Sequence, residues 1–166
     1  MYTTILTPTY NRGENLKKLY KSLLKQKDNN FEWVIVDDGS TDNTKEIIQQ
    51  FLQEAKINLK YLYKENGGKH TALNFAINKI DTDLIFIVDS DDFLTEDAIE
   101  CINNIHKKYI NREDICGYSF LRMFPSKKIN GKPIGKNEII DDYINIRIKR
   151  NDMESDKAEV WKTTCL

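Results

Sequence analysis

Three carboxylates stand within four residues directly after the longest apolar run of the chain. Asp89, Asp91 and Asp92 follow Leu84–Val88. Like charges this close repel one another, and a divalent cation relieves that repulsion. Mg²⁺ and Mn²⁺ bind one or two carboxylates and keep positions free for the phosphates of a substrate. The segment therefore favours a metal site; the alternative is a solvated turn that caps the next helix through Asp92 or Thr95.

A second acidic segment ends the apolar run 33–36. Asp37 and Asp38 are followed there by Gly39 and Ser40. A carboxylate at a strand end can accept a hydrogen bond from a base or a ribose, as acidic residues do in dinucleotide sites. The alternative is an Asx turn that begins the following helix.

Two further segments carry groups suited to a nucleotide. In Thr7–Arg12, Tyr10 can stack on a nucleobase and Arg12 can contact a phosphate. Residues 66–70 read Asn-Gly-Gly-Lys-His, and the free N–H groups of a helix start suit a phosphate or a polar base edge, as does Lys69. An ordinary helix-entry loop is the alternative for Thr7–Arg12, and His70, which has no partner that suggests Zn²⁺, is expected to be a surface histidine at a helix start. Neither glycine-rich nucleotide fingerprint occurs in the chain.

Strands and helices alternate along the first two-thirds of the chain and must position these segments. The continuous apolar run Trp33–Val36 is typical of a strand buried on both faces. The helical spacing of Leu16, Leu19 and Leu23 indicates an amphipathic helix. Helices that connect successive strands make the sheet parallel and cover its two faces. The expected strands cover residues 2–7, 32–37, 59–63, 84–88, 115–124 and 158–163, and the expected helices residues 14–26, 47–55, 72–80 and 96–109.

Three polar segments fall at the carboxyl ends of expected strands. They cover residues 7–12, 37–42 and 89–92. Parallel α/β sheets bind their ligands beyond those strand ends. We therefore expect the three segments to converge on one crevice.

The composition is that of a soluble globular protein with one domain. The chain has 166 residues, of which 40% are apolar and 31% charged. Its 25 Lys and Arg nearly balance its 26 Asp and Glu, which argues against a nucleic acid as partner. Three cysteines without metal-ligand spacing are expected to be reduced thiols. We find no signal segment and no membrane-spanning run, so we expect a cytoplasmic protein.

Four segments, taken in order, resemble the inverting nucleotide-sugar glycosyltransferases of family 2. They read Thr-Pro-Thr-Tyr-Asn-Arg, Val-Asp-Asp-Gly-Ser-Thr-Asp, Asn-Gly-Gly-Lys-His-Thr-Ala-Leu-Asn and Val-Asp-Ser-Asp-Asp. Each falls at an expected strand end or helix start, and the resemblance covers residues 2–94. The resemblance implies the GT-A fold, an α/β architecture with a Rossmann-like, mainly parallel sheet and helices on both faces.

The resemblance also implies roles for individual residues. Pro8 and Tyr10 would line the nucleobase pocket, and Asp38 would bind the base edge, with uracil expected. Asp91 of the DxD motif would be the direct ligand of Mn²⁺ or Mg²⁺, while Asp89 would hold the ribose or a metal-bound water. The implied nucleotide-binding set is Thr7, Pro8, Thr9, Tyr10, Arg12, Asp38, Lys69, Asp89 and Ser90, and the implied metal set is Asp91 and Asp89.

The implied reaction moves a sugar, with inversion, from a UDP-sugar to a glycan or lipid-linked acceptor. A carboxylate base removes the proton of the acceptor hydroxyl. The family places that base downstream of the segment that residues 158–163 resemble, so we expect it beyond Leu166. Asp156 is the best carboxylate within the chain, and Glu154 is second.

The resemblance further divides the chain into a donor-binding half and an acceptor-binding half. It assigns residues 1–109 to the nucleotide-sugar half of a single GT-A domain and residues 110–166 to an incomplete acceptor half. A bacterial surface-polysaccharide enzyme is implied, cytoplasmic or peripheral at the inner face of the membrane. The sequence leaves the sugar, the acceptor and the oligomeric state open.

Several alternatives remain beside the glycosyltransferase. A phosphotransferase of the haloacid-dehalogenase type also has an acidic loop after a strand, but Phe93 stands where that loop carries Thr or Val. An EF-hand requires glycine at the sixth loop position, which is Leu94 here. A sugar nucleotidylyltransferase would carry a glycine-rich loop at the N-terminus, which is missing. A non-catalytic nucleotide-binding or interaction domain stays open, since no base is identified.

Overall fold

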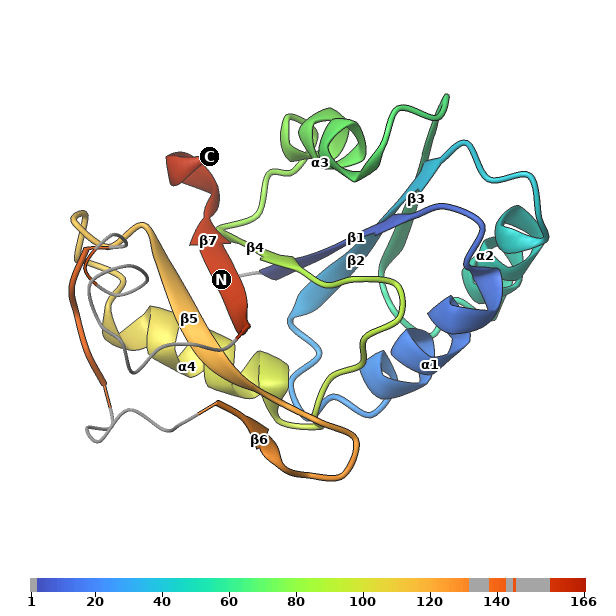
Figure 1. The fold of residues 1–166 in the computed structure, drawn as a ribbon. Coiled ribbons are helices and arrows are strands. Elements are labelled where there is room, and N and C mark those ends of the chain that lie inside the picture. Colours follow the sequence, from blue (N-terminus) through green and yellow to red (C-terminus); the bar gives the residue numbers. More distant parts are fainter. Residues whose placement is uncertain (1–2, 132–137, 143–144, 146–155) are drawn as a thin grey trace. The chain divides into compact units, whose positions relative to one another are not determined.

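The structure is a computed structural model that describes residues 3–131, 138–142, 145 and 156–166 (Figure 1). The chain divides into two compact units. One unit comprises Met1–Tyr118 and Val160–Leu166, and the other comprises Ser119–Glu159. The predicted functional division at residue 109 stays a prediction.

Strands and helices alternate in the first unit, as the sequence predicted. The first expected helix, 14–26, ends three residues early, and the expected strand 2–7 continues to Thr9. The elements are β1 (Thr3–Thr9), α1 (Gly13–Leu23), β2 (Phe31–Asp38), α2 (Thr44–Glu54), β3 (Leu59–Lys64), α3 (Lys69–Ile77), β4 (Leu84–Ile87) and α4 (Ala98–Lys108), with β7 (Lys157–Lys162) and the short 3₁₀ helix Thr163–Cys165 near the end of the chain.

Four strands of the first unit form a parallel sheet in the order β3-β2-β1-β4. Each connection between them contains a helix, which is why they run parallel. β7 adds to the outer edge of β4 in the antiparallel sense, with Trp161 opposite Ile85. Because of this strand the sheet is mainly, rather than wholly, parallel. The predicted α/β architecture is confirmed.

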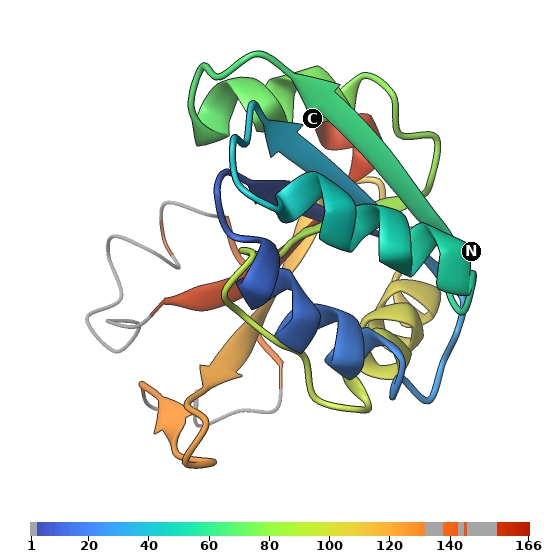
Figure 2. The same ribbon diagram turned by 90° about the vertical axis from the view of Figure 1, so that its right-hand side faces the viewer.

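Helices cover both faces of this sheet (Figures 1 and 2). Side chains alternate between the two faces along a strand. On one face, Leu6 and Val34 pack against the buried Ala72 and Ala76 of α3. The alanines are small, so α3 can approach the strands closely. The continuous apolar runs of the sequence exist because both faces are buried.

An aromatic stack fills the opposite face. The rings of Tyr20 in α1 and Phe51 in α2 are stacked with centroids 4.1 Å apart. Trp33 of β2 lies against both rings, at 6.1 and 6.0 Å. Stacked aromatic side chains bury a large apolar area. They hold α1 and α2 on the side of the sheet away from α3.

The loop that follows β4 is fastened to α1. The amide of Leu94 donates to Ser22 Oγ at 3.1 Å. Gln26, which is 6% exposed, donates to the carbonyl of Thr95 at 2.7 Å and accepts from the amide of Ile99 at 3.1 Å. These bonds satisfy backbone groups of the loop that water would otherwise satisfy. They fix the chain directly after the acidic residues 89–92.

A short hairpin belongs mainly to the second unit. It pairs β5 (Gly117–Met123) with β6 (Ile129–Asn130) in the antiparallel sense. The first two residues of β5 belong to the first unit.

Within the described part of the chain, the helices are all too short or too polar to span a bilayer.

Candidate functional site

A cavity of about 470 Å³ opens in the first unit, at the carboxyl ends of β1, β2 and β4. The three predicted polar segments meet there, joined by the first residue of α3. The nine lining residues are all members of the predicted nucleotide and metal sets. They are Pro8, Thr9, Tyr10, Arg12, Asp38, Lys69, Asp89, Ser90 and Asp91.

Asn11 ties the loop after β1 to the loop after β2. Its backbone lies in the left-handed region, with φ of 51°, which Asn tolerates better than most residues. Its amide donates to Ser40 Oγ at 2.9 Å, and its side-chain oxygen accepts from the amides of Thr41 and Asp42 at 2.8 and 3.3 Å. Asn11 thereby fixes its neighbours Tyr10 and Arg12 beside the cavity. Our sequence reasoning gave it no such role.

Asp38 is a buried carboxylate that organises the loop before α3. It is 3% exposed. Its Oδ1 accepts from Lys64 Nζ at 2.5 Å and from the amide of Gly67 at 3.1 Å, and its Oδ2 accepts from the amide of Gly68 at 2.7 Å. Burial of a charge is tolerated when it is paired and hydrogen-bonded in this way. Lys64, another residue missed by the sequence reasoning, supplies the paired charge.

The surroundings of Asp38 keep it ionised. Burial raises the pKa of its carboxyl group, but the hydrogen bonds from Lys64, Gly68 and Gly67 outweigh burial. The pKa is therefore lower than that of an ordinary aspartate. An ionised carboxylate is acceptor-only and offers about four lone-pair positions. The amide of Gly67 also donates to Oδ2, at 3.3 Å, so both carboxylate oxygens accept from the loop before α3.

Thr9 lines the cavity and carries a buried polar atom that has no hydrogen-bond partner among the described residues. Thr9 is 3% exposed, and its Oγ1 is the buried side-chain atom that lacks a hydrogen bond among the described residues. Such a group costs free energy unless a ligand or water satisfies it. Its neighbour Tyr10 is 46% exposed, so a ring face is available to stack on a ligand.

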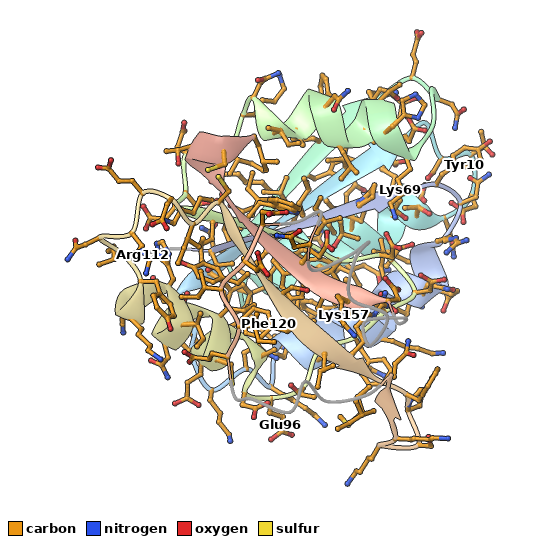
Figure 3. The ribbon with its side chains drawn as sticks, turned by 60° about the vertical axis from the view of Figure 1, so that its left-hand side comes forward. Tyr10, Lys69, Glu96, Arg112, Phe120 and Lys157 are labelled. Carbon is orange, nitrogen blue, oxygen red and sulfur yellow. The ribbon has the colours of Figure 1, made fainter. Side chains whose placement is uncertain are left out.

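Two ion pairs lie across the mouth of the cavity. Lys69 Nζ is 2.5 Å from Asp89 Oδ1, and Arg12 donates to Asp91 Oδ2 at 2.8 Å. Between 42% and 56% of each of these four side chains is exposed. Exposed pairs of this kind contribute little stability, so they can rearrange cheaply around a ligand. Tyr10 and Lys69 are labelled in Figure 3.

The segment after β4 is not a helix cap. Helix α4 begins at Ala98, and its N-terminal flanking residue is Asp97. Neither Asp92 nor Thr95 therefore occupies the capping position that was the alternative for this segment. Ser90 is 3% exposed, whereas the neighbouring Asp89 and Asp91 side chains are about half exposed and line the cavity.

The donor set at β4 suits a metal that shares its coordination with a ligand. Two carboxylates two residues apart are what Mg²⁺ or Mn²⁺ takes from a protein when phosphates supply other ligands. Over the described ranges, no group of three or more His, Cys, Asp or Glu side chains is placed to hold a metal by itself. The residues therefore fit a cation bound jointly with a diphosphate, not one caged by protein.

Thr7 lies outside the cavity lining. It is fully buried in β1, and its Oγ1 accepts from Trp33 Nε1 at 3.0 Å. The hydroxyl satisfies the only polar atom of a large aromatic side chain in the core. The structure thus gives Thr7 a place in the core, in contrast to the nucleotide contact that we expected.

Asp156, the described candidate for the catalytic base, belongs to the second unit. Asp156 forms an ion pair with Arg122, and its side chain is 63% exposed. Glu154 lies outside the described residues. The assignment of Asp156 as a base stays a prediction.

The chain belongs to the glycosyltransferases of family 2. The family model described as Glycosyl transferase family 2 matches residues 4–109. Glycosyltransferase GlyG of Streptococcus pneumoniae serotype 4 is 39% identical over 100 residues, 60% of this chain and 33% of that protein. Putative teichuronic acid biosynthesis glycosyltransferase TuaG of Bacillus subtilis is 35% identical over 98 residues, 58% of this chain and 38% of that protein. The chain thus spans little more than a third of these relatives.

Solved structures share the fold. Staphylococcus aureus TarS 1-349 in complex with UDP-GlcNAc matches with a TM-score of 0.72 and 24% identity, over 99% of this chain and 46% of that one. The mannosyltransferase PcManGT of Pyrobaculum calidifontis, in complex with GDP-Man and Mn²⁺, matches with a TM-score of 0.64 and 22% identity, over 75% of this chain and 36% of that one. The predicted GT-A fold is confirmed.

Proposed function

We propose that the first unit binds a nucleoside-diphosphate sugar together with Mn²⁺ or Mg²⁺. The proposal rests on one observation: a single cavity collects an exposed aromatic ring, two carboxylates two residues apart, and two basic side chains. A nucleoside diphosphate needs each of these groups. UDP is the expected nucleotide, in line with the UDP-GlcNAc bound by TarS.

In this proposal the nucleobase of the ligand lies between Pro8 and Tyr10. Asp38, which lines the cavity, accepts one N–H of the base edge. Its three internal donors hold the carboxylate still, so little rotational freedom is lost when the ligand binds. The unpartnered hydroxyl of Thr9 gains a hydrogen bond from the same ligand.

The diphosphate lies at the ion pairs. Arg12 and Lys69 turn their N–H donors from the carboxylates to phosphate oxygens, which form strong charge-assisted hydrogen bonds. Asp91, with help from Asp89, then becomes free to hold the cation. When bound, the cation supplies positive charge that stabilises the diphosphate as it leaves the sugar.

The whole protein transfers the sugar with inversion. A carboxylate base takes the proton of an acceptor hydroxyl, whose oxygen attacks the anomeric carbon from the face opposite the diphosphate. The acceptor is a glycan or a lipid-linked chain, and the reaction takes place in the cytoplasm. Asp156 is the described candidate for the base, although its partner Arg122 favours a role in the second unit's structure.

A thermal-shift panel tests donor binding. A ligand that binds only the folded protein raises the melting temperature, and at equal concentration a tighter ligand raises it more. We expect UDP-GlcNAc with Mn²⁺ to give a larger rise than GDP-mannose or a dTDP-sugar with Mn²⁺. No rise with any nucleotide sugar, at concentrations far above those that saturate ordinary sites, would refute the proposal.

Sugar transfer needs a separate measurement on the longest form of the protein. Release of UDP should depend on added acceptor and disappear in Asp91→Asn. If the protein binds the donor but its release of UDP does not depend on acceptor, the transfer step is refuted and the protein is a nucleotide-binding domain. This outcome keeps the non-catalytic alternative testable.

A further inference from the structure

The β5–β6 hairpin exposes an apolar face. Leu121 and Met123 lie on the same side of β5 because side chains alternate along a strand. Ile129 pairs directly with Met123 across the hairpin and therefore shares this side. Leu121, Met123 and Ile129 are 39%, 45% and 41% exposed, and Phe124, at the end of β5, is 48% exposed. Apolar side chains this exposed, grouped on one element, are typical of an interaction surface.

The tip of the hairpin is a fixed turn that carries two lysines. The amide of Phe124 donates to the carbonyl of Lys128 at 2.9 Å, and the amide of Lys127 donates to the carbonyl of Phe124 at 2.8 Å. Lys127 has a φ of 64°. Both lysines are exposed. Two positive charges are therefore held beside the apolar face.

The segment around the hairpin is strongly basic, although the whole chain has a net charge of -1. Residues 115–137 contain no Asp or Glu. Their basic residues are Arg122, Lys127, Lys128, Lys132 and Lys136. Of these, Arg122 is paired with Asp156. Positive charge beside apolar side chains complements a surface that is both anionic and apolar.

We infer that the tip of the hairpin binds the surface of an anionic lipid bilayer. Met123, Phe124 and Ile129 enter the boundary between headgroups and acyl chains, while Lys127 and Lys128 contact lipid phosphates. A folded protein partner fits less well, since lysine is depleted at the buried centre of protein interfaces. The inference concerns the second unit and does not depend on donor binding.

Vesicle flotation tests the inference. The probes are vesicles of phosphatidylcholine and vesicles that also contain phosphatidylglycerol. We expect the protein to float with the anionic vesicles at low salt and to be released as salt rises. Each lysine near an anionic surface contributes about fivefold in binding. The double variant Lys127→Glu with Lys128→Glu should therefore bind at least tenfold more weakly.

Matched variants separate the hairpin from general charge. Lys18→Glu with Lys45→Glu makes the same change in net charge on exposed positions of α1 and α2, and should leave flotation nearly unchanged. Met123→Ser with Phe124→Ser should reduce flotation although it changes no charge.

Three results would overturn the inference. They are equal binding to neutral and anionic vesicles, equal losses in the two lysine pairs, and no flotation with either vesicle. If the protein stays in solution but binds heparin through Lys127 and Lys128, the surface recognises soluble polyanions, and the bilayer inference is wrong. Donor binding can persist or fail in any of these cases, so the two proposals are tested separately.

Discussion

At the residue scale, Asp38 connects the stability of the first unit to the shape of the cavity. Its carboxylate holds the amides of Gly67 and Gly68 and the ammonium group of Lys64. Removal of the charge would leave these donors with a weaker acceptor in a buried place. A buried group with this many partners has a structural role, beside the nucleobase contact that we propose for it.

Asp38→Asn should lower the free energy of unfolding by about 2 kcal/mol, because hydrogen bonds to a buried charged group are worth roughly 1.5–3 kcal/mol. Urea unfolding at neutral pH measures the loss. Asp91→Asn is the control, because Asp91 is half exposed and its ion pair with Arg12 should contribute less than about 1 kcal/mol. Equal losses in the two variants would show that Asp38 is not the organising carboxylate.

The contribution of the Asp38 carboxylate to the free energy of unfolding should depend on pH. Its pKa in the folded protein is lower than in the unfolded chain, where an aspartate titrates at about 4. A lowered pKa contributes stability that is present above the unfolded pKa and is lost as pH falls through the folded pKa. The difference in unfolding free energy between wild type and Asp38→Asn should therefore be constant near neutral pH and shrink below about pH 4. A difference that grows with acidity would contradict this assignment.

Lys69 provides a second test at this scale. We expect Lys69→Met to weaken UDP binding about tenfold, since it removes one charge-assisted hydrogen bond to phosphate. Binding of uridine, which has no phosphate, should not change. The melting temperature should also stay the same, because the ion pair with Asp89 is exposed. Lys45→Met on α2 is the control, and a loss of uridine binding in Lys69→Met would indicate a general disturbance of the site.

At the element scale, the site is built from loops that touch one another beyond the strand ends. Gly39 follows β2 and lies against the loop before α3. Its φ is +79°, and a Cβ at this position would lie 2.7 Å from the backbone nitrogen of Asn66. Glycine is required there for both reasons. The close approach is what allows Asp38 to reach the amides of the neighbouring loop.

Gly39→Ala should destabilise the first unit by about 1–3 kcal/mol through backbone strain and collision. Gly67→Ala is the control. Gly67 has no positive φ, and a Cβ there meets a side-chain atom, Thr71 Oγ1, at 2.8 Å rather than backbone. Urea unfolding should show the larger loss in Gly39→Ala, and an equal or larger loss in Gly67→Ala would refute the importance of the close backbone approach.

The sequence predicts the elements and the lining of the cavity better than it predicts the bonds between loops. Periodic apolar residues mark α1 and the buried strands because the same packing that buries them sets their spacing. Asn11 and Lys64 gave no such signal, since their roles depend on partners brought close only by the folded sheet. Thr7 shows a related limit: the resemblance implied a nucleotide contact, which stays a prediction, and only the folded sheet shows that its hydroxyl accepts from Trp33 in the core.

At the scale of the whole molecule, a net charge near zero conceals two regions of opposite charge. The net charge of -1 combines carboxylates at the cavity with a basic segment around the β5–β6 hairpin. In our account the carboxylates receive a cation, Arg12 and Lys69 receive the diphosphate, and the hairpin receives an anionic surface. Calorimetry tests ligand binding at the cavity, and vesicle flotation tests lipid binding at the hairpin.

The most direct test of the central claim is calorimetric titration of the protein with UDP, with Mn²⁺ and with EDTA. We predict saturable binding in Mn²⁺ that weakens at least tenfold in EDTA, because Asp91 would hold the cation and the cation would offset the negative charge of the diphosphate. Asp91→Asn should lose most of the Mn²⁺ effect and behave like wild type in EDTA. UDP affinity that is the same in Mn²⁺, in EDTA and in Asp91→Asn would contradict the account, as would the absence of binding to folded protein.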